Sequence, residues 1–422
     1  MKFDRSKKWI ILISSFLAGQ GSVQVLNLIA GFLLLRWLSV EAYAQYSVAF
    51  GFQSTLGLLV DLGFSGSIIA LVGDRGSDKE VVGKYVRSAR YFRNRLYSFI
   101  IPFAAIAFPL VTAKQGWDRN TQVLLFASIV IALFFQGWVA YYSSPLLIHQ
   151  RLKQYYQPQI VGAVGRIVFC FILQIVAALT SWVAAWINSA VSVVIGFLYK
   201  QKAVFLIDEP EDSDSKSNQE MVRYLAPVIP GIIFTALQGQ IAVLLITLFG
   251  QTKNIAEVAA LGRLGQLFLI LTASNSVIVQ PYIAKVSQHQ LFKRYLLMLG
   301  FAIAICVVVC AIAFLFPQPL LWVLGPKYQN LQVEVGWTVV ASCLSYVGTV
   351  MWTMHAARKW TYWWYTALYI MLLLIVQTIA VAVMDLSTTL NVIYFSIITA
   401  TTIIGVHIVA GIYGFNYGST NQ

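Results

Sequence analysis

The chain has 422 residues, of which 59% are hydrophobic and 11% are charged. Soluble globular domains hold roughly 45–50% apolar and about 25% charged residues, so this composition excludes an ordinary soluble enzyme, a disordered chain and a nucleic-acid-binding domain. The excess of 29 Lys and Arg over 16 Asp and Glu residues is then interpreted as membrane topology, because cytoplasmic loops of membrane proteins collect basic residues.

Apolar stretches long enough to cross a bilayer follow one another along the whole chain. Six fall at 9–35, 43–73, 96–113, 122–142, 158–179 and 182–199, and six more at 224–249, 255–280, 295–316, 333–355, 361–384 and 389–413. The sequence therefore predicts an all-α, polytopic membrane protein with about 12 transmembrane helices. The stretches 295–316 and 361–384 are almost entirely apolar, so we expect them to face lipid.

One polar segment, 200–223, separates the two sets of six and contains the acidic run Asp208–Asp214. Low hydropathy and a block of like charge are typical of disorder. We therefore predict an N-terminal six-helix lobe at 1–199, a disordered, cytoplasmic acidic linker at 200–223 and a C-terminal six-helix lobe at 224–422.

The distribution of basic residues predicts the orientation. If the N-terminus is cytoplasmic, 22 of the 29 Lys and Arg residues fall on the cytoplasmic side, five on the outer side and two within spans. This bias predicts that both termini are cytoplasmic and that the first apolar stretch is a retained span. The basic segment 79–95 carries Val82, Val86 and Ala89 at helical spacing, which favours a helix lying along the inner membrane surface.

Polar side chains within the spans are the strongest candidates for function, because a charge at mid-span costs roughly 2.5–3.5 kcal/mol on insertion scales. They gather on single helix faces, which hold Gln20, Gln24 and Asn27 in 9–35, Gln53 and Asp61 in 43–73, Arg166 in 158–179, and Arg263 and Gln266 in 255–280; Arg36 lies at the outer end of the first stretch. Arginine offers a permanent charge and a planar fork that suits phosphate oxygens.

Three of these charges allow two interpretations. Asp61, the one acidic residue deep in a span, either exchanges a coupling ion or forms a buried ion pair that joins two helices. Arg36 either contacts ligand or reaches toward the membrane surface near Glu41. Glu257 is predicted to be solvated at an outer helix end, and it is a second candidate for ion coupling.

Several chemistries find no support in the sequence. The four histidines are scattered, the four cysteines lie within apolar runs, and no phosphate-binding loop or dinucleotide fingerprint is present. No enzyme activity, disulfide framework, metal site or cofactor is predicted, so energy for transport must come from an ion gradient, the membrane potential or the substrate gradient. Pro227 and Pro230 at the start of 224–249 mark either a helix N-terminus or a break in the span.

Two short segments resemble the bacterial polysaccharide flippases of the multidrug/oligosaccharidyl-lipid/polysaccharide exporter superfamily. The segment Leu33–Tyr46 is similar to the family's junction between its first two helices, with Ser39-Val40 in place of Gly-Pro and Ala44 in place of Gly. The segment Leu59-Val60-Asp61-Leu62-Gly63-Phe64 matches the family's Leu-x-Asp-Leu-Gly-Phe. In the second half, Gln240 stands where the family commonly has an Asp. This departure bears on the contacts of the coupling ion in that half.

The resemblance implies two six-helix lobes related by a pseudo-two-fold axis, with alternating access to a central cavity. It implies transport of an undecaprenyl-pyrophosphate-linked oligosaccharide from the cytoplasmic to the outer leaflet of the bacterial inner membrane, coupled to protons or sodium. Its partners would be membrane lipids and other polysaccharide assembly proteins. Arg36, Arg166 and Arg263 would meet the pyrophosphate or acidic sugars, and Gln20, Gln24, Asn27, Gln53 and Gln266 would meet sugar hydroxyls.

Three rival functions make different demands on the sequence. A drug or cation antiporter of the same superfamily should prefer carboxylates to arginines in its cavity. A membrane-embedded polymerase or acyltransferase tends to need a large outer loop or a His/Asp pair. A scaffold without transport would gain nothing from polar stripes within its spans.

Overall fold

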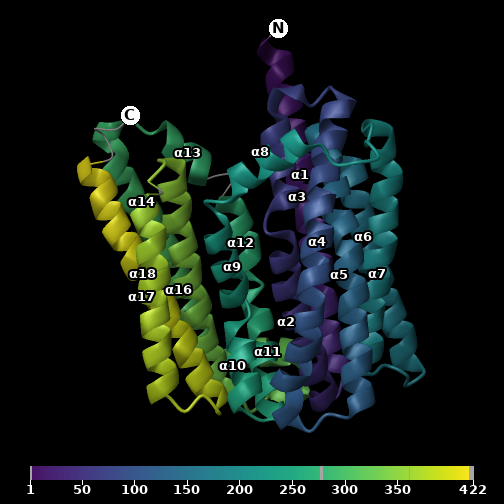
Figure 1. The fold of residues 1–422 in the computed structure, drawn as a ribbon. Coiled ribbons are helices and arrows are strands. Elements are labelled where there is room, and N and C mark those ends of the chain that lie inside the picture. The colour runs from purple at the N-terminus through teal and green to yellow at the C-terminus, as the bar shows by residue number, and fades with distance from the viewer. Residues whose placement is uncertain (1, 276–278, 361, 418–422) are drawn as a thin grey trace. The chain divides into compact units, whose positions relative to one another are not determined.

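The computed structural model describes residues 2–275, 279–360 and 362–417, apart from the side chains of residues 2–17, Asp74, Ile270, Ala273, Ser274 and Trp363. All regular elements in this part of the chain are helical (Figure 1). The helices are α1 Lys2–Trp37, α2 Val40–Asp61, α3 Phe64–Val72, α4 Lys79–Thr112, α5 Arg119–Ile148, α6 Leu152–Ile175, α7 Ser181–Ala203, α8 Ser215–Leu225, α9 Ile229–Gln238, α10 Ile241–Phe249, α11 Thr252–Gly265, α12 Phe268–Ser274, α13 Gln280–Lys285, α14 Gln288–Leu315, α15 Pro317–Leu324, α16 Gln332–Ala357, α17 Trp363–Val383 and α18 Thr389–Tyr417. They form two compact units, Met1–Leu244 and Leu245–Gln422.

The described helices confirm a polytopic membrane protein. Nine of them are long and apolar enough to cross a bilayer, and the number rises to eleven if two bent pairs, α2 with α3 and α8 with α9, each count as one span. The single helices predicted for 224–249 and 255–280 are wrong. The first stretch divides among α8, α9 and α10 near Pro227 and Pro230, since proline disrupts the helix backbone. The second contains α11 and α12, and its residues 276–278 lie outside the described part of the chain.

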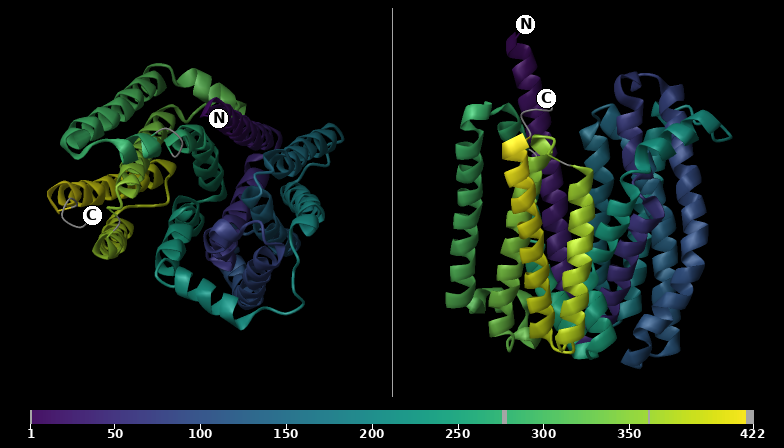
Figure 2. Two further views of the ribbon diagram at one scale, coloured as in Figure 1. Left: turned by 90° about the horizontal axis from the view of Figure 1, so that it is seen from above. Right: turned by 60° about the vertical axis from the view of Figure 1, so that its left-hand side comes forward.

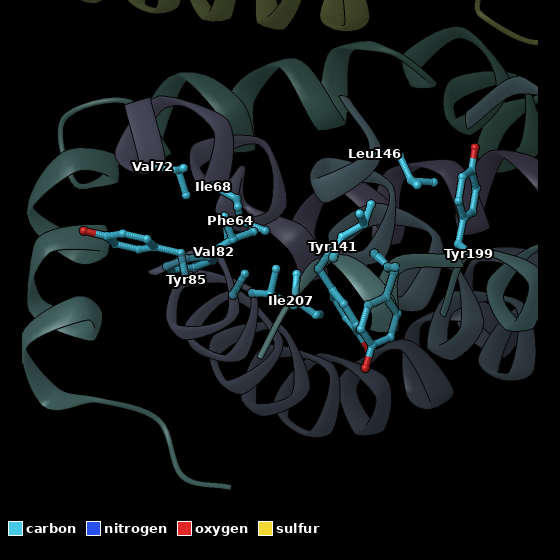
Figure 3. Close-up of a cluster of buried hydrophobic side chains, with 14 of the residues drawn as sticks. Phe64, Ile68, Val72, Val82, Tyr85, Tyr141, Leu146, Tyr199 and Ile207 are labelled. Atoms are coloured by element: carbon cyan, nitrogen blue, oxygen red, sulfur yellow. The ribbon is translucent and has the colours of Figure 1, made fainter. Parts of the chain in front are cut away.

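In the first unit, α1 packs against α6, α6 against α7, and α7 against α5, while α2 contacts α4, α5, α7 and α9. The main apolar core lies where α3, α4 and α5 meet, as Figure 3 shows for Phe64, Ile68, Val82 and Tyr141. The amphipathic helix α8 lies across one end of these helices, against α3 and α4 (Figures 1 and 2). It closes the core with Met221 and Leu225, which are almost fully buried.

The surface helix predicted at 79–95 is wrong, because these residues form the first half of the continuous helix α4. Val82, Val86 and Ala89 are fully buried in the core of the first unit rather than in lipid. The periodicity was a sound indication of an amphipathic helix, but burial of its apolar face against α3, α5 and α8 satisfies the same pattern.

The disorder predicted for the acidic segment is also wrong. The N–H of Asp208 donates to the carbonyl of Lys79 at 3.1 Å. The Glu209 carboxylate lies 2.9 Å from Arg90 Nη1 and 3.9 Å from Arg87 Nη1. The segment is ordered because its negative charge meets the basic face of α4, a partner that composition alone does not reveal. Asp214 then begins α8 by accepting hydrogen bonds from the N–H groups of Lys216 and Ser217, which together with the Ser217 hydroxyl lower its pKa.

Gly83 allows this close approach, and it supplies a test of the docking. A Cβ at position 83 would overlap the carbonyl oxygen of Asp208, a backbone atom that cannot turn aside. We expect Gly83→Ala to lower the free energy of unfolding by about 1–3 kcal/mol, the usual cost of overpacking, measured by denaturation of the purified protein. Gly66→Ala is the matched control, because a Cβ there meets nothing within 4 Å. Equal effects of the two substitutions would contradict the docked arrangement.

The second unit is built around α16, which packs against α11, α13, α14 and α18, while α17 packs against α18. Its core joins Tyr295 and Cys306 of α14 to Cys343 and Met351 of α16. Large apolar side chains of α14 and α17 are exposed, as the prediction of lipid-facing helices requires; they include Phe301, Val307, Ile312, Met371, Ile375 and Ile379. All four cysteines are free thiols.

Candidate substrate site

A chain of side-chain hydrogen bonds crosses four helices of the first unit and is centred on Arg166 of α6. The guanidinium donates from Nη2 to Asn27 Oδ1 on α1 at 2.6 Å and from Nη1 to Asn188 Oδ1 on α7 at 3.4 Å. Asn188 Nδ2 in turn donates to Gln53 Oε1 on α2 at 3.3 Å. The structure thus brings together three residues that the sequence placed in separate spans, and adds Asn188.

The guanidinium of Arg166 is hydrogen-bonded to neutral amides. The ion pairs found among the described residues do not include Arg166, so no described carboxylate lies within 4 Å of its nitrogens. Its Nε atom is buried without a hydrogen-bond partner in that part of the chain. A permanent cation in the middle of a spanning helix, with amide oxygens but no carboxylate beside it among the described residues, can accept an anionic ligand.

The polar face of α1 continues from this network. Gln20, Gln24 and Asn27 follow one another at spacings of four and three residues and so share one face of the helix. Gln20 and Gln24 are half-buried, and Asn27 is exposed. An exposed amide midway along a spanning helix is costly against lipid, so this face favours contact with water or a polar ligand.

A second hydrogen bond, outside this network, joins α2 to α7. Ser181 Oγ donates to Gln45 Oε1 at 2.5 Å, and both side chains are buried. Together with the bond between Asn188 and Gln53, it fixes the register of α2 against α7. The amides of the site are therefore held by rigid helices rather than by loops.

Asp61 forms an ion pair that joins two helices, as one of the two interpretations of its sequence position has it, although the carboxylate side chain is 20% exposed. Its Oδ1 accepts from Arg93 Nη1 at 3.1 Å and from Ser65 Oγ at 2.5 Å. Arg93 also donates from Nη2 to the Leu133 carbonyl, and its side chain is only 5% exposed. Gly137 leaves room for it, since a Cβ there would lie 2.5 Å from Arg93 Nε.

The ion pair lies at the break between α2 and α3, where the axes differ by 41°. Asp61 is the last residue of α2, and the next two residues, Leu62 and Gly63, both have left-handed backbone conformations with φ of 44° and 84°. A left-handed leucine is costly and persists only where its surroundings fix it. The Leu-x-Asp-Leu-Gly-Phe segment is therefore the helix break itself, and Ser65 ties the two sides of the break to one carboxylate.

The predicted residues of the second unit have different surroundings. Arg263 near the end of α11 donates to Gln266 Oε1 at 3.3 Å, and both side chains are half-buried. The prediction of a solvated Glu257 is wrong, because this residue is only 6% exposed. Glu257 accepts from Thr389 Oγ1 at 2.6 Å and lies 3.9 Å from Lys253 Nζ, so it joins α11 to the start of α18. In the first unit, Arg36 lies half-buried in the last turn of α1.

The structure also brings together residues that sequence reasoning missed. Arg93 falls within the basic segment 79–95, although it continues the spacing of Val82, Val86 and Ala89 on the buried face. Histidines described as scattered in the sequence lie close together in the second unit. The ring centroids of His355 and His407 are 5.6 Å apart, and each ring has a tyrosine hydroxyl partner. No group of three or more potential metal ligands occurs among the residues that the structure describes.

Comparison with known proteins identifies the family. A model of the family described as polysaccharide biosynthesis protein matches residues 7–287, which is more than half of the chain. The chain belongs to this family. A search of curated proteins gives no match.

Solved structures of other proteins share the fold of this chain. An inward-facing multidrug resistance MATE family transporter of the MOP superfamily is 16% identical, with a TM-score of 0.67, over 94% of this chain and 96% of that chain. The lipid II flippase MurJ in an inward closed conformation is 12% identical, with a TM-score of 0.64, over 98% and 93%. A MOP superfamily transporter from Pyrococcus furiosus is 15% identical, with a TM-score of 0.60, over 97% and 95%. These similarities confirm the predicted fold class, and the family match confirms the resemblance seen in the sequence.

Proposed function

We propose that this polysaccharide biosynthesis family member flips an undecaprenyl-pyrophosphate-linked oligosaccharide from the cytoplasmic to the outer leaflet of the bacterial inner membrane. The observation that carries the proposal is the Arg166 guanidinium, which is held at mid-span by amides and has no described carboxylate partner. A pyrophosphate would supply the missing negative charge and would match the planar fork of arginine. The shared fold with a lipid flippase is compatible with a lipid-linked substrate.

Amides beside the cation fit the rest of this substrate. Gln20, Gln24, Asn27 and Gln53 each offer both a donor and an acceptor, as sugar hydroxyls require. Arg36 is proposed to meet the substrate at the outer end of α1. In the C-terminal half, Arg263 and Gln266 are proposed as a second cationic and amide pair. The predicted lobes at 1–199 and 224–422, with both termini cytoplasmic, complete this alternating-access scheme.

Asp61 is the proposed site of ion coupling. Its carboxylate bridges Arg93 and Ser65 at a helix break, so gain or loss of a proton would change the forces across that break. Sodium bound by the same carboxylate would act on the same contacts. Glu257 is proposed as a second coupling site, since it is a buried carboxylate that joins two helices of its unit.

Lipid analysis of a strain lacking this protein tests the function. We expect sugar-loaded undecaprenyl pyrophosphate to accumulate on the cytoplasmic side, and expression of the wild-type chain to clear it. The cation-antiporter rival predicts no such accumulation and a greater sensitivity to cationic dyes instead. If the protein were a polymerase or an acyltransferase, its loss would leave the lipid-linked unit flipped but not extended or not acylated.

A further inference from the structure

The first half of α4 carries an open groove of about 650 Å³ that plays no part in the proposed transport. Three arginines line it, namely Arg87, Arg90 and Arg95, and Asn94 and Ser98 lie among them. These positions recur every three or four residues, so the polar groups project from one side of the helix. The groove therefore combines three permanent cations with neutral hydrogen-bonding groups.

The charges in the groove are only partly balanced. Glu209 lies 2.9 Å from Arg90 Nη1 and 3.9 Å from Arg87 Nη1, and Arg87 also donates to the Glu211 carbonyl. Arg95 makes no ion pair with any described residue; instead its guanidinium lies 4.5 Å from the centroid of the Tyr91 ring. Among the described residues, one carboxylate thus pairs with two of the three guanidinium groups, which leaves the charge of Arg95 unbalanced.

The same helix places this groove at the depth of lipid head groups. Between Arg95 and Lys114 the chain carries no charged residue, and this interval spans about 29 Å at ~1.5 Å per residue. That length matches the hydrocarbon core of a bilayer, about 30 Å thick. Arg95 is therefore at one boundary of the hydrocarbon, and Arg87 and Arg90 extend beyond it toward the water.

Beyond the groove, toward the C-terminal end of α4, the exposed surface of this helix is apolar. Phe99 lines the groove and is 65% exposed, and Phe103, Ile106 and Leu110 continue with exposures of 60–69%. A cationic groove directly above an exposed apolar stripe is complementary to an amphiphile with an anionic head and acyl chains. A soluble anion would use only the upper part of this surface.

We propose that the groove binds the phosphate head group of an anionic membrane phospholipid, with its acyl chains along Phe99, Phe103 and Ile106. Arg95 supplies the free charge, and Arg90 and Arg87 are shared between the lipid phosphate and Glu209. The segment 208–212 therefore competes with the lipid for α4. Anionic lipid content would control how firmly this segment docks, by a site separate from Arg166.

Native mass spectrometry of the purified full chain, with phosphatidylglycerol and phosphatidylcholine as probes, tests the proposal. We expect preferential retention of phosphatidylglycerol and about fivefold weaker retention in Arg95→Gln, the effect of one basic residue near an anionic surface. Because Arg95 is exposed and unpaired among described residues, its removal leaves the fold intact, which size-exclusion chromatography checks. Arg151→Gln removes another exposed arginine, immediately before α6, and should leave retention unchanged.

Glu209→Gln provides the opposite change. It frees Arg90 and Arg87 from their carboxylate, so phosphatidylglycerol retention should rise above the wild-type level. Equal losses in Arg95→Gln and Arg151→Gln, or no loss in Arg95→Gln, would overturn the site. Unchanged retention in Glu209→Gln would overturn the competition with segment 208–212.

Discussion

We expect Arg166→Gln to slow flipping strongly while the protein remains folded in the membrane. Glutamine can still donate and accept hydrogen bonds with Asn27 and Asn188, so the contacts among α1, α6 and α7 remain available. The positive charge and the planar fork are lost, and with them the attraction for a pyrophosphate. A charge-assisted bond to phosphate is worth about 1.5–3 kcal/mol, so rates should fall by at least one order of magnitude.

Arg166→Lys separates charge from geometry at the same position. Lysine keeps the charge but loses the fork that holds two phosphate oxygens and both amides at once. We expect an intermediate rate, measured as clearance of accumulated lipid-linked oligosaccharide by each variant at equal protein level. Arg151→Gln, which removes an exposed arginine from the start of the same helix, is the control and should behave as wild type. Full activity of Arg166→Gln would exclude this residue from substrate binding.

The second large effect concerns the buried ion pair. Asp61→Leu leaves Arg93 without its carboxylate where only 5% of the arginine side chain is exposed. Removing one partner of a buried pair costs about 3–5 kcal/mol, because the remaining charge loses its compensation. We therefore expect a large loss of unfolding free energy in Asp61→Leu and a similar loss in Arg93→Met, measured by denaturant titration of the purified protein.

Combining the two substitutions distinguishes a structural role from ion coupling. The double variant Asp61→Leu with Arg93→Met removes both charges, so most of the stability should return. If Asp61 is also the coupling site, this stable variant will no longer respond to an imposed proton or sodium gradient. Gradient-driven transport at the wild-type level in the double variant would show that Asp61 is purely structural.

The sequence predicts the helical membrane fold well because long apolar stretches have few alternatives in a bilayer. It also finds the polar residues of the site, since Asn27, Gln53 and Arg166 are conspicuous in apolar surroundings. Their contact through Asn188 depends on how α1, α2, α6 and α7 pack, which periodicity does not specify. The sequence around Asn188 indicates a polar helix face, because Ser192 lies one turn further along α7.

Three of the errors share one physical origin, which is contact with residues distant in the sequence. The acidic segment has the composition of a disordered linker until Arg87 and Arg90 provide its counter-charges. Segment 79–95 has the pattern of a surface helix, but α8 and the core of the first unit cover its apolar face. Glu257 has the position of a solvated residue until Thr389 of a distant helix binds it. The contacts of Glu209 and Glu257 join residues more than a hundred positions apart, and α8 likewise lies more than a hundred positions from segment 79–95.

Reconstitution of the purified chain in liposomes tests the central claim most directly. A lipid-linked oligosaccharide with a fluorescent sugar is placed in one leaflet, and its arrival in the other leaflet is measured by quenching. The account predicts translocation by the wild-type protein, loss of translocation in Arg166→Gln, and no translocation of an organic cation by either. Transport of the cation, with the lipid-linked sugar left in its original leaflet, would contradict it.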